Sequence, residues 1–280
     1  MKTIYTYPEL LVELSEIKRP MGFVPTMGFL HEGHLSLIRK AKQENSSVVV
    51  SIFTNPTQFA PEEDLENYPT DIDRDLELLM TEGVDLVWIP AVTAMYPESF
   101  QTWVSVDQMT KFLEGVYRPS HFRGVTTIVS KLFNAVRPER AYFGQKDAQQ
   151  ARVIQQMVVD LYYPIEIVVC PIIREEDGLA MSSRNSYLSV QEREAALCLS
   201  RALKAAQETF SAGERNAEVL REIVSREIII EEAAKIQYIS CAHPNTLEEL
   251  NGEIQACLIS LAVFVGNTRL IDNIILPEPY

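Results

Sequence analysis

The sequence lacks several features that mark specialised classes of protein. Its 280 residues include four cysteines, Cys170, Cys198, Cys241 and Cys257, and no pair of them has the C-x-x-C spacing of metal and redox sites. No apolar run is long enough to span a bilayer, and the first residues, MKTIYTYPEL, lack the apolar segment of a leader peptide. We therefore expect a cytoplasmic protein with reduced, mostly buried thiols and no membrane partner.

Basic residues are also scarce. Lys and Arg number 25 against 39 Asp and Glu, so the formal net charge is −14. Such a surface repels polyanions, so we expect no nucleic-acid partner, and a phosphate ligand would need a local site. The sequence contains no G-x-x-x-x-G-K-[ST] loop, no G-x-G-x-x-G fingerprint and no G-x-S-x-G elbow. P-loop chemistry is thereby excluded, and the signature motifs of classical dinucleotide binding and of serine hydrolases are missing.

The composition is that of a globular protein, with 46% hydrophobic and 23% charged residues. The spacing of apolar residues predicts strands at 22–27, 46–56, 84–90, 141–144 and 165–173, the last buried on both faces. It predicts helices at 34–43, 71–82 and 125–136 and another from about 147. This alternation is typical of an α/β fold with a Rossmann-like, doubly wound parallel sheet.

The pattern changes after about residue 174, where REEDGLAMSSRN predicts a loop or hinge. Helices are expected at 189–207 and 217–230, and strands at 235–242 and 257–266. The sequence thus predicts a nucleotide-binding domain over 1–174 and a smaller α+β domain over 175–280. Because a flexible polar loop joins the two, we expect the smaller domain to act as a lid.

The first candidate for chemistry is PTMGFLHEGHLSLI, residues 25–38. A strand ends here, Gly28 permits a tight turn, and His31 and His34 fall at the start of a helix, where phosphate groups bind. Gly33 leaves room for a ligand to approach. Two alternatives stay open for the histidines, namely surface residues near a helix cap and, less well supported, a metal site without a third ligand.

Polar residues follow two other predicted strands. Asn55 and Gln58 offer neutral amides suited to a hydroxylated or carboxylate small molecule, although an Asn-Pro turn also explains Asn55. Lys146 is placed to neutralise a triphosphate, and Asp147 to cap a helix, or to hold a ribose or a Mg²⁺ ion through water. A solvated surface pair is the alternative for Lys146 and Asp147.

The polar loop at 174–188 carries two adjacent serines followed by an arginine, at 182–184. Ser182, Ser183 and Arg184 can surround phosphates, with Arg184 supplying a permanently charged planar fork. An ordinary linker between domains is the alternative.

Five segments in this order carry a specific resemblance: PTMGFLHEGH, SIFTNPTQF, LEGVYRPSHFRGV, FGQKDAQQ and REEDGLAMSSRN. Together they resemble the pantoate–β-alanine ligase family, within the H-x-G-H adenylate-forming and nucleotidylyl-transferase superfamily. The resemblance runs from about Ile4 to Tyr187 and is weaker beyond, where TRLIDN (268–273) matches best.

The resemblance implies an ATP-dependent ligation of pantoate and β-alanine to pantothenate. Pantoate would attack the α-phosphate of ATP to give pantoyl adenylate and pyrophosphate, and β-alanine would then displace AMP. Positioning and electrostatics would dominate such chemistry. The resemblance also implies Mg²⁺ and a homodimer formed through the nucleotide-binding domain.

The resemblance carries site residues over to matching positions. The implied catalytic residues are His31, His34 as proton donor, and Lys146. The implied pantoate ligands are Asn55, Gln58 and Gln150, with Gln58 also near β-alanine. The implied ATP contacts are Met27, Gly28, Phe29, Leu30, His31, Glu32, Gly33, His34, Gly144, Gln145, Lys146, Asp147, Ile173, Met181, Ser182, Ser183 and Arg184. Ile173, Thr70 and Ser120 stand where the family leads us to expect Val, Arg and Gly; Ile173 would contact adenine through its backbone, and no metal ligand is assigned.

Three other functions compete. A nucleotidylyltransferase of the same superfamily would share the histidine site, but the glutamines of NPTQF and KDAQQ suit a small hydroxy acid. A non-catalytic nucleotide-binding module would not need two histidines, a lysine and an arginine from separate loops. A metal-dependent hydrolase would show bound metal in the purified protein.

Overall fold

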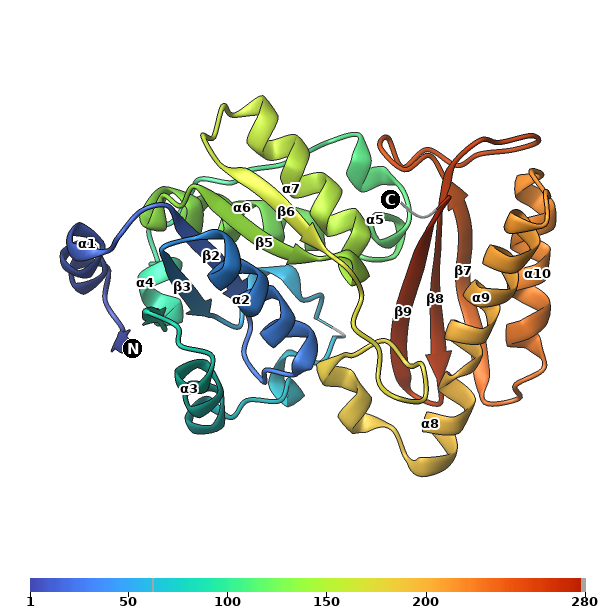
Figure 1. The fold of residues 1–280 in the computed structure, drawn as a ribbon, viewed down its shortest axis with the longest axis horizontal. Helices are drawn as coiled ribbons and strands as arrows, with labels where there is room; N and C mark the ends of the chain where they lie inside the picture. The colour runs from blue at the N-terminus through green and yellow to red at the C-terminus, as the bar shows by residue number, and fades with distance from the viewer. Residues whose placement is uncertain (62, 278–280) are drawn as a thin grey trace.

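The computed structural model describes residues 1–61 and 63–277, which form two sheets with helices packed against each (Figure 1). The strands are β1 Lys2–Ile4, β2 Met21–Thr26, β3 Ser47–Ile52, β4 Leu86–Trp88, β5 Arg140–Gly144, β6 Glu166–Cys170, β7 Ala234–Ala242, β8 Cys257–Val265 and β9 Thr268–Leu276. The α-helices are α1 Tyr7–Glu16, α2 Glu32–Glu44, α3 Ile72–Thr81, α4 Val92–Met95, α5 Glu114–Tyr117, α6 His121–Val136, α7 Ala148–Asp160, α8 Val190–Ala196, α9 Cys198–Ser211 and α10 Ala217–Ile229. The 3₁₀ helices are η1 Pro56–Gln58, η2 Leu65–Asn67, η3 Met109–Lys111, η4 Gln145–Asp147 and η5 Ser183–Tyr187.

The larger sheet is parallel throughout, with the strand order β1-β4-β3-β2-β5-β6. Helices α2 and α3 pack on one face, against Val24 and Val50 among others. Helices α1, α6 and α7 pack on the other face, against Phe23 and Val49. Since successive residues of the central strands are buried on opposite faces, the strands are apolar without alternation. The doubly wound α/β fold predicted from the sequence is confirmed.

The strand expected at 165–173 was wrong in its length and burial. Strand β6 ends at Cys170 and lies at the edge of the sheet, with Glu166 exposed and the next three residues only partly buried. The apolar run continues into 171–173, and these residues line a cavity instead of pairing with a neighbouring strand. The continuous apolar run therefore consists of two parts, an edge strand and a segment of the cavity wall.

The order of the strands creates a crevice between β2 and β5. From β2 the chain proceeds through β3 to β4 on one side, whereas β5 leads to β6 on the other side. At such a reversal the loops leaving adjacent parallel strands diverge, and ligands bind outside the carboxyl ends. The loops after β2 and β5 carry His31 and Lys146, so the topology brings these two side chains to one crevice.

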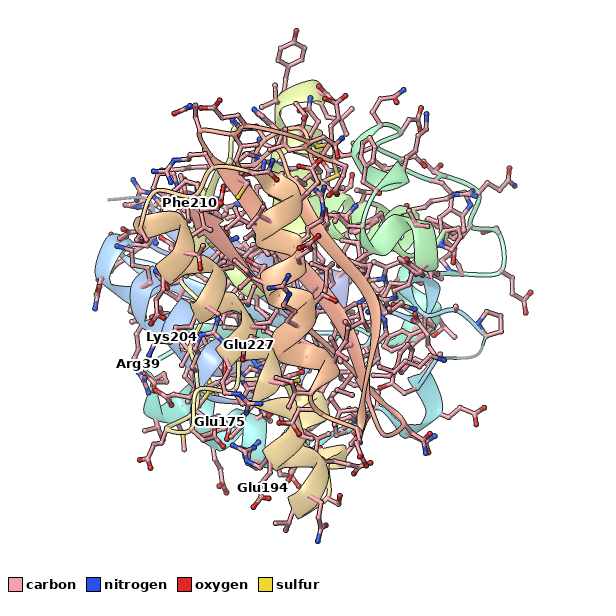
Figure 2. The ribbon with its side chains drawn as sticks, turned by 90° about the vertical axis from the view of Figure 1, so that its right-hand side faces the viewer. Arg39, Glu175, Glu194, Lys204, Phe210 and Glu227 are labelled. Atoms are coloured by element: carbon pink, nitrogen blue, oxygen red, sulfur yellow. The ribbon has the colours of Figure 1, made fainter. Side chains whose placement is uncertain are left out.

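The smaller part of the chain is built on an antiparallel sheet, β7-β8-β9, against which α9 and α10 pack. Figure 2 views the molecule from this side, with Lys204 of α9 on the outer surface and Phe210 of the same helix buried. The helical region expected at 189–207 consists of two helices, α8 and α9, separated by Leu197. Strand β9 was not expected as a separate element. No helix in 1–61 or 63–277 combines the length and apolar character needed to cross a membrane.

The two parts pack directly against each other (Figure 1). Glu114 of α5 accepts two hydrogen bonds from Arg269 of β9, at 2.7 and 2.8 Å, and one from the hydroxyl of Tyr238 on β7, at 2.9 Å. A small apolar cluster lies beside them, formed by Leu113, Ala148, Leu247 and Leu258. The boundary at residue 174 and the role of the smaller part as a lid stay predictions.

Candidate active site

A cavity of about 240 Å³ opens at the carboxyl ends of β2, β3, β5 and β6. Most side chains singled out from the sequence line it: Met27, His31, Gly33, His34, Asn55, Gln58, Gly144, Lys146, Asp147, Gln150, Ile173, Met181, Ser182, Ser183 and Arg184. Four separate segments of the sequence thus converge on one hollow. This convergence disfavours the alternatives of surface histidines, a solvated ion pair and a plain linker.

The remaining residues of the predicted ATP segments, Gly28, Phe29, Leu30, Glu32 and Gln145, do not line the cavity. The carboxylate of Glu32 pairs with Arg39 on the surface. The side chain of Gln145 donates to Asn273 at 3.0 Å. Contacts of the Glu32 and Gln145 side chains with ATP therefore gain no support from this geometry.

The loop after β2 is held in an unusual backbone conformation by a buried carboxylate. Gly28 and Phe29 have φ of +88° and +51°, which glycine adopts freely and phenylalanine does not. Asp75 of α3, fully buried, accepts the N–H groups of Phe29 and Leu30, both at 2.7 Å. Burial raises the pKa of Asp75, and the two backbone bonds oppose that shift. Sequence analysis missed Asp75, which shapes the approach to His31.

The two histidines are held by backbone hydrogen bonds at the start of α2. Nδ1 of His31 accepts from the N–H of Gly33 at 3.2 Å, and Nδ1 of His34 accepts from the N–H of His31 at 3.3 Å. Because a backbone N–H only donates, each neutral ring must carry its proton on Nε2. The backbone thus fixes the tautomer, and each ring offers Nε2–H as a donor.

Both rings are neutral at physiological pH. Burial, with a smaller contribution from the Lys146 charge, lowers the pKa of His31 to about 4, against an opposing effect of Asp147. Burial and the neighbouring His31 lower the pKa of His34 well below its ordinary value. A neutral imidazole donor can stabilise charge that develops on an oxygen without titrating near neutral pH.

Asn55 and Gln58 lie after β3 and contact each other. The Asn55 amide uses all its polar groups within the protein: Nδ2 donates to Oε1 of Gln58 at 3.1 Å and to the Gly124 carbonyl at 3.2 Å, and Oδ1 accepts from Thr57 and Tyr96. Gln58 Nε2 donates to the sulfur of Met27 at 3.0 Å. The polar groups of Asn55 are therefore satisfied by the protein, whereas Gln58 makes one hydrogen bond to Asn55 and one to a sulfur atom.

An arginine and a third histidine line the same cavity, and sequence analysis assigned them no role. His121 Nδ1 donates to the carbonyl of Gln58 at 2.9 Å, so its Nε2 accepts from Arg118 at 3.3 Å. Arg118 forms a bidentate pair with Glu63, at 2.5 and 2.8 Å. Both residues fall in LEGVYRPSHFRGV, so that segment of the resemblance was the available signal.

Lys146 and Gln150 reach the cavity from the segment after β5. Within the described residues, no hydrogen bond or ion pair engages the Lys146 ammonium or the Gln150 amide. Asp147 is the N-cap residue of α7, yet its carboxylate makes no capping hydrogen bond. These three polar groups are therefore available to a ligand.

Arg184 already has an anionic partner. Its guanidinium makes a bidentate pair with Asp64, at 2.9 and 2.7 Å, and that carboxylate holds the pKa of Arg184 above its ordinary value. The charged fork expected for phosphate is present, but a carboxylate occupies it. Sequence analysis missed Asp64, which is 120 residues away along the chain.

No group of three potential metal-binding side chains occurs within residues 1–61 and 63–277. A metal site built by the protein alone, as in a metal-dependent hydrolase, gains no support from these residues. Asp147 is the acidic side chain that lines the cavity.

Comparisons with known proteins agree with this architecture. Residues 1–275 match the family model described as pantoate-beta-alanine ligase. Pantothenate synthetase of Roseiflexus sp. strain RS-1 is 54% identical over 276 residues, which cover 99% of each chain. That of Thermotoga petrophila is 52% identical over 279 residues, covering 99% of this chain and 100% of the relative.

Solved structures give the same result. A pantothenate synthetase structure from Thermus thermophilus matches with a TM-score of 0.93 and 44% identity, covering 98% of this chain and 99% of that one. The pantoate-beta-alanine ligase of Francisella tularensis, complexed with beta-gamma ATP and beta-alanine, matches with a TM-score of 0.82 and 35% identity, covering 98% and 97%. The four convergent segments, the near-complete match of the family model and these full-length likenesses agree, and the chain belongs to the pantoate–β-alanine ligase family.

Proposed function

We propose that the cavity at the carboxyl edge of the parallel sheet carries out both steps of the ligation, through a pantoyl adenylate. The chain is an ATP-dependent ligase that joins pantoate to β-alanine. A carboxylate is a poor acyl donor, and adenylation supplies a good leaving group. A carboxylate oxygen of pantoate attacks the α-phosphorus as the bond to pyrophosphate breaks. The neutral amine of β-alanine then attacks the acyl carbon, AMP leaves with the electrons of the acyl–oxygen bond, and one amine proton is released to solvent as the amide forms.

The observation that carries this proposal is the convergence on a single cavity of two neutral imidazole donors and one ammonium that has no partner among the described residues. His31 and His34 donate through Nε2–H to phosphate oxygens, and Lys146 neutralises charge that accumulates on the departing pyrophosphate. These groups are fixed before the reaction, so little reorganisation is required in the transition state. His34, the residue matched to the family's proton donor, acts as a neutral donor.

Arg184 contributes by exchanging partners. The phosphates of ATP compete with Asp64 for its guanidinium, and the serine-containing segment Ser182–Ser183 lies beside them along the cavity. Bidentate pairing with phosphate has the same geometry as pairing with carboxylate. ATP binding therefore releases the Asp64 carboxylate as it engages Arg184.

Pantoate binds between Gln58 and Gln150, which line the cavity from two separate segments of the chain. Their amides both donate and accept, as the hydroxyl and carboxylate groups of pantoate require. Gln58 also contacts β-alanine as it enters. Asn55, whose own polar groups are satisfied by the protein, holds Gln58 in place.

A Mg²⁺ ion that accompanies ATP would be held at this cavity mainly by phosphate oxygens. In proteins such an ion usually keeps several waters and takes one or two carboxylates as further ligands. Asp147 lines the cavity, and its carboxylate makes no hydrogen bond that caps α7. It therefore fits as a ligand of an ion held mainly by the nucleotide. When bound, Mg²⁺ would neutralise charge on the phosphates.

The chain is further proposed to form a homodimer through residues 1–174 and to reside in the cytoplasm. Apolar side chains are exposed on α1, including Leu11 and Val12, and such exposed apolar surface within residues 1–174 suits a protein–protein interface. The four cysteines are free and buried, in keeping with a reducing compartment. Sedimentation at several protein concentrations tests the dimer.

Exchange of labelled pyrophosphate into ATP tests the proposed mechanism. Exchange should require pantoate and proceed without β-alanine, and exchange that ignores pantoate would contradict an adenylate of pantoate. Lys146→Met retains much of the apolar stem and removes the ammonium. This variant should lose exchange yet still convert preformed pantoyl adenylate and β-alanine to pantothenate. An equal loss in both half-reactions, with the fold intact, would place Lys146 near the acyl or adenylate group instead.

A further inference from the structure

The stretch TRLIDN at the end of the chain has no role in the mechanism above. It forms the first part of β9, in the smaller part of the molecule. Its last two residues, Asp272 and Asn273, are polar but nearly fully buried, with 2% and 4% of their surface exposed. Buried polar groups require partners, and both side chains find partners in the larger part.

Asn273 is hydrogen-bonded to the segment that carries Lys146. Its Nδ2 donates to the backbone carbonyls of Gln145 and Lys146, at 3.0 and 2.8 Å. Its Oδ1 accepts from the side chain of Gln145 at 3.0 Å. One planar amide thus makes three hydrogen bonds to η4, at the point where Lys146 turns toward the cavity.

Asp272 forms an ion pair with the segment that leads to Ser182 and Arg184. Its carboxylate accepts from both terminal nitrogens of Arg174, at 2.6 and 3.1 Å. Arg174 is the first residue of a hairpin that is closed by its bridge to Ala180 and by a 3.0 Å bond from the Met181 N–H to the Ile173 carbonyl. Ser182 and Arg184 follow directly on this hairpin.

We infer that Asn273 is a positioning residue for adenylate formation, and that it sets the place of Lys146 through the backbone of η4. The inference rests on the proposed role of Lys146 toward the triphosphate. Two adjacent carbonyls facing one side chain require two N–H donors in a plane, which an amide supplies and a carboxylate does not. Asn273→Asp is nearly isosteric, but it puts an oxygen against two carbonyl oxygens and displaces the segment.

The inference assigns the smaller part a task in the first half-reaction that does not depend on its movement. A misplacement of about 1 Å in a positioned group costs on the order of 10²-fold in rate. After pyrophosphate has left, Lys146 has no triphosphate to neutralise, so the placement of η4 no longer matters. Loss of Asn273 should therefore slow pyrophosphate exchange but not the reaction of preformed pantoyl adenylate with β-alanine. General loosening of the interface would slow both half-reactions.

The experiment compares Asn273→Asp with two other variants in the full chain. Asn273→Asp should lower pyrophosphate exchange by about 10- to 100-fold and change the conversion of preformed pantoyl adenylate by less than about 3-fold. Gln145→Leu removes one of the three bonds and should move exchange in the same direction by a smaller factor. Tyr238→Phe is the matched control, because it removes a buried hydrogen bond across the same interface, at 2.9 Å to Glu114, without touching η4. It should change both half-reactions by less than about 2-fold.

Lys146→Met, measured alongside, separates failure of the inference from failure of the proposed function. If Lys146→Met slows only pyrophosphate exchange, but Asn273→Asp affects both half-reactions equally or neither, the inference is overturned and the proposed function stands. If Lys146→Met lowers both equally, the placement of the triphosphate is wrong, and the inference falls with it. If Asn273→Asp melts early, Gln145→Leu carries the test, and equal effects of Gln145→Leu on both half-reactions overturn the inference.

A double variant tests whether Asn273 acts through Lys146. In a Lys146→Met background, Asn273→Asp should change the residual rate of pyrophosphate exchange by less than about 2-fold, because the group that it positions is gone. Independent effects of the two substitutions would show that Asn273 acts on another group, and would overturn the inference.

Discussion

Replacing the buried carboxylate of Asp75 by an amide tests how the loop before His31 is held. Asp75 accepts hydrogen bonds from the N–H groups of Phe29 and Leu30, and its side chain is fully buried. Asp75→Asn preserves size but keeps only one acceptor oxygen. The other position becomes an NH₂ group that faces a backbone donor, and Phe29 is held at a positive φ that it would not adopt freely.

The expected magnitude follows from these two bonds. A hydrogen bond to a charged group contributes about 1.5–3 kcal/mol, and a stranded buried donor costs about 1–3 kcal/mol. Asp75→Asn removes one bond and the charge from the other, so the free energy of unfolding should fall by about 3 kcal/mol. For a chain of this size that corresponds to a decrease in Tm of about 6 °C. Pyrophosphate exchange should fall by about 10-fold, because the loop leads directly into His31.

Thermal unfolding at pH 8 and the exchange assay check both effects. Asp73→Asn is the matched control, since it makes the same change of charge on the same helix at an exposed position. It should leave Tm within about 1 °C of the parent. A Tm and an exchange rate for Asp75→Asn that equal those of Asp73→Asn would refute the argument that this carboxylate holds the loop.

Four further outcomes are expected. His34→Ala should lower exchange by about 10²–10³-fold with little change in Tm, because one preorganised donor is removed; exchange near the parent rate would contradict its role. Gln58→Ala and Gln150→Ala should each weaken pantoate use by about 1–3 kcal/mol while calorimetry shows ATP binding kept, and equal losses for both ligands would contradict the assignment. Burial lowers the pKa of His121 to about 4 in the folded chain, below the unfolded value of about 6.5, so the unfolded chain takes up the proton first as pH falls. The free energy of unfolding should accordingly decline below pH 6.5, by about 2 kcal/mol at pH 5 from this group, and urea titrations in which His121→Gln shows an undiminished decline would contradict that. Proteolysis near Gly178 should slow when ATP and Mg²⁺ are added if the smaller part closes, and unchanged cleavage would remove the support for a lid.

The sequence predicted those parts of the site whose geometry is local. A strand, a glycine and a helix start determine where His31 lies, and parallel pairing of β2, β3 and β5 brings the segments after them to one edge. These rules depend on periodicity and on residues within one loop. They therefore located Gln58 and Lys146 at the cavity without any knowledge of tertiary contacts.

The partners of these residues could not be predicted in the same way. Asp75 is 45 and 46 positions from the N–H groups that it accepts, Asp64 is 120 from Arg184, and Asn273 is 127 from Lys146. An acidic or amide residue in a polar stretch has no periodic signature that marks it as buried. The same limitation explains β6, because an apolar run does not distinguish a central strand from an edge strand that continues into a cavity wall.

Gly33 shows how far a local motif can specify its own geometry. The sequence suggested that this glycine admits a ligand, but a Cβ here would come within 2.9 Å of the His31 ring. The two imidazoles lie 4.1 Å apart and are both capped by backbone N–H groups of the same turn. Four consecutive residues thus fix the place, orientation and tautomer of both rings, so the histidine side of the cavity needs no distant support beyond the loop that leads into it. Lys146 lies in the short 3₁₀ helix η4, where no backbone group of the described residues fixes its ammonium, and its backbone carbonyl accepts a hydrogen bond from Asn273 of β9 in the other part of the molecule. The histidines should therefore keep their geometry in a variant that loses the contacts of Asn273, whereas the lysine should not.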